Sequence, residues 1–156
     1  MNRDVETSVT KKQSKQSEAQ VHLSKAGEKL ESARVLLENG FSDDAASRAY
    51  YAVFHAVVAM LRARDVTLDI HKHAFVLTQF KLRFVDNNEF PLEMYFKIQQ
   101  VKQVREQADY SAIVTIPKEK VMRLIADAKE IVGKIKDMLD KEFPREKPRG
   151  ELDTTG

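Results

Sequence analysis

The chain has 156 residues, of which 26 are Lys or Arg, 24 are Asp or Glu and none is Cys. This length fits one domain with tails, and the lack of cysteine excludes disulfides, thiolate zinc sites and a cysteine nucleophile. The net charge of +2 neither indicates nor excludes a nucleic-acid partner. The longest apolar run, 56–61, ends at Arg62, far short of the roughly 20 residues of a membrane span, and the first residues lack the apolar stretch of a secretory signal. We therefore expect a cytoplasmic protein without a membrane partner.

The two ends of the chain are poor in apolar side chains. Residues 1–17 contain one methionine and two valines as their only apolar residues, too few to offset the entropy cost of ordering the segment. This composition predicts a disordered N-terminal arm. Residues 143–156 carry two prolines and two glycines and are predicted to form a flexible tail. The folded domain is expected over 18–142.

Apolar residues recur at helical spacing through this predicted domain. The first helix carries a stripe with steps of three and four from Leu23 to Leu37, and Gly40 follows its end. Pro117 is a favoured first-turn residue for the last helix. No segment alternates with period two over strand length. The patterns predict an all-α, up-and-down four-helix bundle with one additional short helix, with helices over about 18–39, 42–64, 71–85 and 91–110, and from 117 onward.

The second helix is unusual on the side opposite its predicted core face. At 100° per residue, that ridge carries Arg48, Ala52, His55, Ala59 and Arg62. Tyr51 and Val58 flank the ridge, where a solvated face would carry charged side chains. Alanines between cations and an imidazole favour a groove that holds an anion, or a surface that meets another chain. The simpler alternative is a surface arginine in an ion pair and an ordinary helical histidine.

Three local motifs resemble those of HEPN domains (higher eukaryotes and prokaryotes nucleotide-binding). Residues 47–56 read SRAYYAVFHA, with six residues between Arg48 and His55, and the HEPN mark is an Arg, four to six residues and a His on the second long helix of an α-bundle. The Tyr-Tyr-Ala-x-Phe-His wording is similar to a small stand-alone prokaryotic branch. Lys72-His73 opens the third helix as in that branch, and 105–110 match its Arg-x-x-Ala-Asp-Tyr pattern. The resemblance covers about 18–140.

The resemblance implies an RNA-directed role. It first implies that the protein is a metal-independent endoribonuclease. This enzyme would be the toxin of a toxin–antitoxin pair whose antitoxin is a minimal nucleotidyltransferase. The second implication of the resemblance is a non-catalytic HEPN module that binds a nucleotidyltransferase or a nucleotide. The resemblance also implies a homodimer in which two Arg/His helices face a shared cleft. No cofactor or metal is expected. A helical structural subunit without a ligand is a third, weaker interpretation.

The chemistry of the two motif residues suits RNA cleavage. An imidazole can act as base or acid near neutral pH, which makes His55 the predicted proton-transfer residue. A guanidinium matches phosphate oxygens bidentately, which makes Arg48 the predicted phosphate clamp. Seven residues of helix separate their Cα atoms by roughly 10 Å, a loose spacing that a dimer presenting two such pairs would relieve.

Five further residues are predicted to bind substrate or to support the catalytic pair. Arg105 and Asp109 form an i,i+4 pair followed by Tyr110, which predicts a brace or an RNA contact; the alternative is a helix-end salt bridge worth a few tenths of a kcal/mol. His73 is interpreted as a first-turn structural residue or as part of the cleft. Tyr51 is expected to stack on a base or to contact a second protomer. His22, on the first helix, has no partner in the sequence.

Overall fold

The computed structural model describes residues 2–110, 112 and 115–144. The described residues form an all-α structure, as the sequence predicted, and contain no strand. None of their helices is long and apolar enough to cross a membrane. In chain order, the elements are α1 (Asn2–Glu38), α2 (Ser42–Ala63), α3 (His73–Phe80), the π-helical turn η1 (Lys81–Val85), α4 (Leu92–Tyr110) and α5 (Lys118–Glu142).

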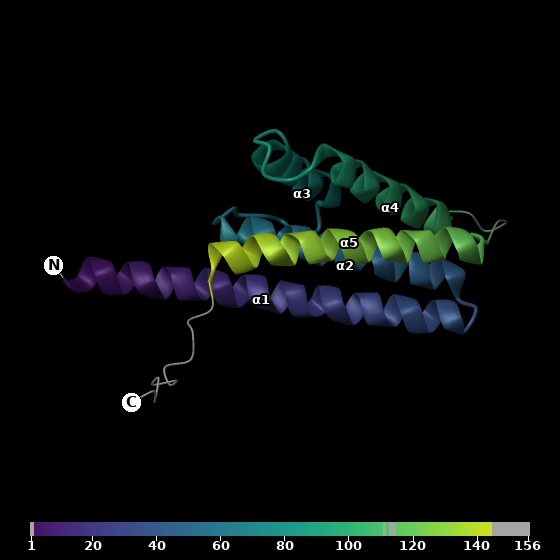
Figure 1. Cartoon of the computed structure of the whole chain (residues 1–156), viewed down its shortest axis with the longest axis horizontal. Coiled ribbons are helices and arrows are strands. Elements are labelled where there is room, and N and C mark those ends of the chain that lie inside the picture. The colour runs from purple at the N-terminus through teal and green to yellow at the C-terminus, as the bar shows by residue number, and fades with distance from the viewer. Residues whose placement is uncertain (1, 111, 113–114, 145–156) are drawn as a thin grey trace, which may run out of the picture.

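Helix α2 is the centre of the bundle. It packs against α1, α3, α4 and α5, and Figure 1 shows α1 and the α3–α4 pair on opposite sides of the α2–α5 layer. The turn from α1 into α2 is closed by Gly40, whose φ of 86° lies in the left-handed region. The Phe41 N–H donates back to the Leu36 carbonyl at 2.9 Å. This tight reversal makes α1 and α2 antiparallel neighbours along their length.

The central position of α2 corrects the prediction of an open alanine ridge. Ala52, Val58 and Ala59 are each 0% exposed, so they are part of the core and cannot form a surface for another chain. The helical-wheel reasoning assumed one core face opposite one exposed face. A helix that is apolar nearly all round is instead covered on most sides by its neighbours, and small alanines let those neighbours approach closely.

The third predicted helix is shorter than expected and ends differently. Helix α3 begins at His73, and at residue 81 the α-helical pattern gives way to the π-helical turn η1. The Asp86 N–H donates to the Lys81 carbonyl at 2.9 Å, which is the i to i+5 bond of a π-helix. The start of α3 lies against α2, where His73 stacks on Phe54.

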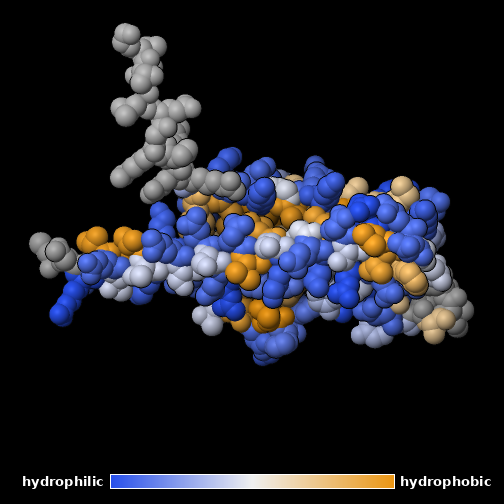
Figure 2. All heavy atoms as spheres, turned by 90° about the horizontal axis from the view of Figure 1, so that it is seen from below, coloured by the Kyte–Doolittle hydropathy of each residue, from blue (hydrophilic) through white to orange (hydrophobic). Residues whose placement is uncertain are grey.

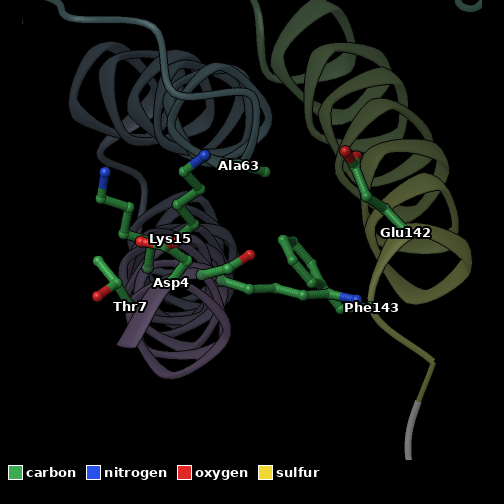
Figure 3. Close-up of a pocket in the computed structure, with 9 residues that line it drawn as sticks. Asp4, Thr7, Lys15, Ala63, Glu142 and Phe143 are labelled. Carbon is green, nitrogen blue, oxygen red and sulfur yellow. The ribbon is translucent and has the colours of Figure 1, made fainter. Parts of the chain in front are cut away.

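The N-terminal segment also differs from expectation. Helix α1 begins at Asn2, in the segment predicted to be a disordered arm, and its first turns project beyond the other helices in Figure 1. Val5 and Val9 remain 64% and 52% exposed, and Figure 2 shows apolar side chains on the projecting end. A hollow of about 590 Å³ lies between these turns, Ala63 and the end of α5, with Phe143 between the two helices (Figure 3). Most of the predicted flexible tail, 145–156, lies outside the described residues.

Candidate functional site

The site lies where side chains in the middle of α2 reach solvent. From Arg48 to Arg62, only four α2 side chains are partly or fully exposed: Arg48, Tyr51, His55 and Arg62. Their spacing of three, four and seven residues places them on one helical stripe, which we call the α2 stripe. Helix α1 borders the α2 stripe on one side, and α3 and α4 border it on the other. The stripe is therefore a narrow strip between packed helices, and it contains both motif residues, Arg48 and His55.

Helix α1 contributes a second histidine to the site. The Nδ1 atom of His22 lies 3.2 Å from the Nδ1 atom of His55, and the two rings are stacked with centroids 5.4 Å apart. Both side chains are partly buried. His22 is four residues before Ala26 and eleven before Ala33, two fully buried residues on the α2-facing side of α1. Its register therefore aims it at α2.

Aromatic side chains from α2 surround the first residue of α3. The ring of His73 stacks on Phe54 with centroids 4.2 Å apart, and its Nδ1 shares a 2.9 Å hydrogen bond with the Tyr50 hydroxyl. Tyr51 meets the same imidazole edge-on at 5.9 Å. His73 therefore packs among aromatic side chains at the start of α3 and lies beside Tyr51 of the α2 stripe.

Arg105 of α4 completes this aromatic cluster. Its guanidinium carbon lies 4.9 Å from the ring centroid of Tyr50 and 5.3 Å from that of Tyr51, within cation–π distance. Its Nη2 donates a long hydrogen bond of 3.4 Å to the Tyr51 hydroxyl. Its Nε lies 3.0 Å from the Asp109 carboxylate, but this buried N–H has no aligned acceptor. The i,i+4 ion pair therefore exists and also anchors an arginine that holds Tyr51.

The last two predicted residues are placed differently from this cluster. Tyr110 is 87% exposed at the end of α4, so it does not pack with the other aromatic residues. Arg48 is exposed, and within the described part of the chain its guanidinium makes no hydrogen bond or ion pair. An exposed, uncommitted guanidinium on the α2 stripe has the properties that a phosphate clamp requires.

The electrostatics of the two facing histidines favour their neutral forms. Burial is the main cause that lowers the pKa of His55 to about 4, and His22, Lys25 and Lys29 contribute to the same shift. Burial also lowers the pKa of His22, with Lys25 and Arg62 adding to the effect. At neutral pH both rings are therefore uncharged, and cations surround them. An anionic ligand placed here would be attracted by those cations and would raise both pKa values.

Burial and a neighbouring cation also shift pKa values on the other side of the α2 stripe. Burial and then the Arg105 guanidinium lower the pKa of His73, and burial raises the pKa of the Tyr50 hydroxyl to about 12. Tyr50 is therefore a neutral phenol, and it can donate its proton to a neutral His73 in the hydrogen bond between them. No three His, Asp or Glu side chains in the described residues come together as a set of metal ligands.

Comparison with known proteins places this bundle in a family. The HEPN domain model matches residues 19–138. A Methanocaldococcus jannaschii protein named "Putative toxin" is 32% identical, over 85% of this chain and 87% of its own. A second protein of that organism with the same name is 36% identical, over 78% of this chain and 89% of that protein. A Thermotoga maritima protein named "UPF0332 protein" is 30% identical, over 74% and 86%. The chain belongs to the HEPN family, as its motifs predicted.

Sequence reasoning missed His22 as a member of the site. The signal was present, because His22 shares the buried side of α1 with Ala26 and Ala33. A histidine on the side of a helix that packs against its neighbour is expected to find a polar partner there. The partner's identity required the register between α1 and α2, which the sequence does not specify.

Proposed function

We propose that this protein is a metal-independent endoribonuclease, and that it is the toxin of a toxin–antitoxin pair whose antitoxin is a minimal nucleotidyltransferase. The observation that carries the proposal is the α2 stripe, on which an exposed arginine and a partly buried imidazole occur at the family's motif spacing. The names of the two M. jannaschii relatives support the toxin role. The cations around the stripe support a polyanionic substrate.

The residues of the site divide the work of RNA cleavage among them. Arg48 binds the non-bridging oxygens of the scissile phosphate and stabilises the charge that develops in the transition state. His55 exchanges protons with the reacting oxygens, and the bound phosphate raises its pKa toward the neutral range. Tyr51 offers a ring face to a nucleobase. Arg105 and Asp109 hold Tyr51, and His73 supports its edge.

We further propose that the functional unit is a homodimer, with contacts different from those first expected. The alanines of α2 are buried within one chain, so the partner must contact the rims of the stripe. Phe75 of α3 and Phe96 of α4 are 47% and 58% exposed and can contribute apolar area. Two facing stripes would bring the Arg48 of one protomer toward the His55 of its partner, which would relieve the long spacing within one helix.

The experiment that tests the ribonuclease proposal uses purified full-length protein, RNA and an excess of chelator. We expect cleavage products with a 2′,3′-cyclic phosphate, because the attacking group is the RNA's own 2′-OH, and no cleavage of DNA, which lacks that group. Loss of a positioned acid or base costs about 100- to 10,000-fold in rate, so His55→Ala should leave almost no activity. Expression of the chain alone should stop cell growth, and co-expression of a neighbouring nucleotidyltransferase should restore it.

One observation favours the second candidate function, a non-catalytic module that binds a nucleotidyltransferase or a nucleotide. A pKa of about 4 for His55 makes that imidazole a weak base on its own. This function predicts nucleotide or partner binding that depends on Arg48, with no cleavage of any RNA. Calorimetric titration with a nucleotidyltransferase and with nucleotides, beside the cleavage assay, separates the two functions.

A further inference from the structure

We propose that His22 is the second proton-transfer residue of the site, and that His22 and His55 work as one relay pair of opposite tautomers; this inference rests on the proposed ribonuclease function. The carrying observation is the 3.2 Å separation of their Nδ1 atoms across α1 and α2. Neither the family motif nor the sequence pattern assigns a role to His22. The pair also explains how a site with a weakly basic His55 could still transfer protons, because two rings share the work.

The tautomers follow from the hydrogen-bonding chemistry of imidazole. A neutral ring carries one proton, on either Nδ1 or Nε2. Two neutral rings that meet through their Nδ1 atoms hydrogen-bond only when one Nδ1 is protonated and the other is not. The donating ring then has a bare Nε2, which is a base, and the accepting ring has an Nε2–H, which is an acid. The uncharged pair therefore offers one base and one acid to a substrate.

The surroundings keep this pair uncharged at neutral pH. Lys25 and Lys29 of α1, Arg62 of α2 and His73 of α3 all oppose protonation of one ring or the other. From α4, Arg105 and Lys102 act on His73. Among the described residues that act on the two rings, Glu18 is the carboxylate that acts in the opposite sense, on the His22 ring. Partial burial is the largest cause that lowers both pKa values, and the cations add to it, so the neutral pair is the resting state.

The cleavage step balances with this pair and needs no other reactant. The bare Nε2 accepts the proton of the 2′-OH while O2′ forms a bond to phosphorus. The P–O5′ bond breaks, its electron pair stays on O5′, and the Nε2–H of the other ring gives O5′ its proton. The Nδ1 proton crosses the 3.2 Å contact between His22 and His55. Both rings end neutral with their tautomers exchanged, and exchange with water resets them.

Two substitutions at position 22 separate a relay from a merely structural contact. An asparagine amide lies where the imidazole Nδ1 was, so His22→Asn keeps a hydrogen bond to His55 but cannot relay a proton to a second ring nitrogen. His22→Ala removes both features. His71→Asn is the matched control, because His71 is exposed in the loop before α3 and takes no part in the pair. The cleavage assay is run on all three variants in chelator across pH 6 to 8.

The relay predicts that His22→Asn and His22→Ala both lose about 100-fold or more in cleavage rate, while His71→Asn equals wild type. It also predicts that the wild-type rate does not fall as the pH rises from about 7 to 8, since no imidazolium is consumed. Nitrogen-15 NMR of the free protein near neutral pH should show one Nδ1–H and one Nε2–H ring. Wild-type activity in His22→Asn, or the same tautomer on both rings, overturns the relay. Wild-type protein that cleaves nothing overturns the ribonuclease function instead, and the relay with it.

Discussion

Acid should destabilise this protein through its partly buried histidines, and His55 gives the largest predicted effect. The fold holds the pKa of this ring at about 4, against 6.5 for an unperturbed histidine. The unfolded chain therefore binds the extra proton first, so stability is complete at pH 7 and is lost as pH falls from about 6.5 toward 4. At about 1.4 kcal/mol per pKa unit the upper bound is about 3 kcal/mol, and solvent screening at a partly exposed site reduces it to about 1 to 2 kcal/mol.

The assay is urea unfolding of wild type and His55→Asn at several pH values between 7 and 4. Carboxylates titrate in both proteins, so the difference between the two curves isolates the histidine. We expect wild type to lose about 1 to 2 kcal/mol more than the variant over this interval. The exposed His71 provides the control, and His71→Asn should follow wild type. Parallel curves for wild type and His55→Asn would refute the burial and charge argument for the site.

Three further predictions test other parts of the structure. Ala59→Leu should cost about 1 to 3 kcal/mol in free energy of unfolding, because it overpacks a fully buried position; a surface ridge would tolerate it, and chemical unfolding measures the difference. Arg48→Lys should keep the melting temperature of wild type and lose RNA cleavage, since lysine retains the charge without the planar fork; an active Arg48→Lys would remove the clamp from the mechanism. The side chains of residues 3–12 are all exposed, so deletion of residues 2–12 should shift the melting temperature by only a few degrees. A larger drop, measured by calorimetry, would show that the projecting turns of α1 stabilise the bundle.

The helices that carry regular apolar stripes could be predicted from sequence because their burial follows their own periodicity. The end of the first helix at Gly40 and the start of the last one after Pro117 came from local backbone chemistry. The predictions that were wrong concern features that tertiary packing determines. A helix of alanines and valines looks amphipathic on a wheel, yet in α2 neighbours cover Ala52 and Ala59 as well as the predicted core face.

The site could be predicted only where its residues share one element or one motif. Arg48 and His55 were found on the second helix, and the pairing of Arg105 with Asp109 was found from its helical spacing. The contacts that join different helices were not accessible, because they depend on how far one helix slides along another. The His22–His55 contact and the stacking of His73 on Phe54 are of this kind.

The most direct test of the central claim compares one RNA oligonucleotide with its fully 2′-O-methylated copy, using purified full-length protein in excess chelator. If the α2 stripe cleaves RNA through its 2′-OH, wild type converts the RNA to products ending in a 2′,3′-cyclic phosphate and leaves the methylated copy intact. His55→Ala then gives no product above background while it unfolds like wild type. Intact RNA with wild-type protein, or equal cleavage by His55→Ala, would contradict the account.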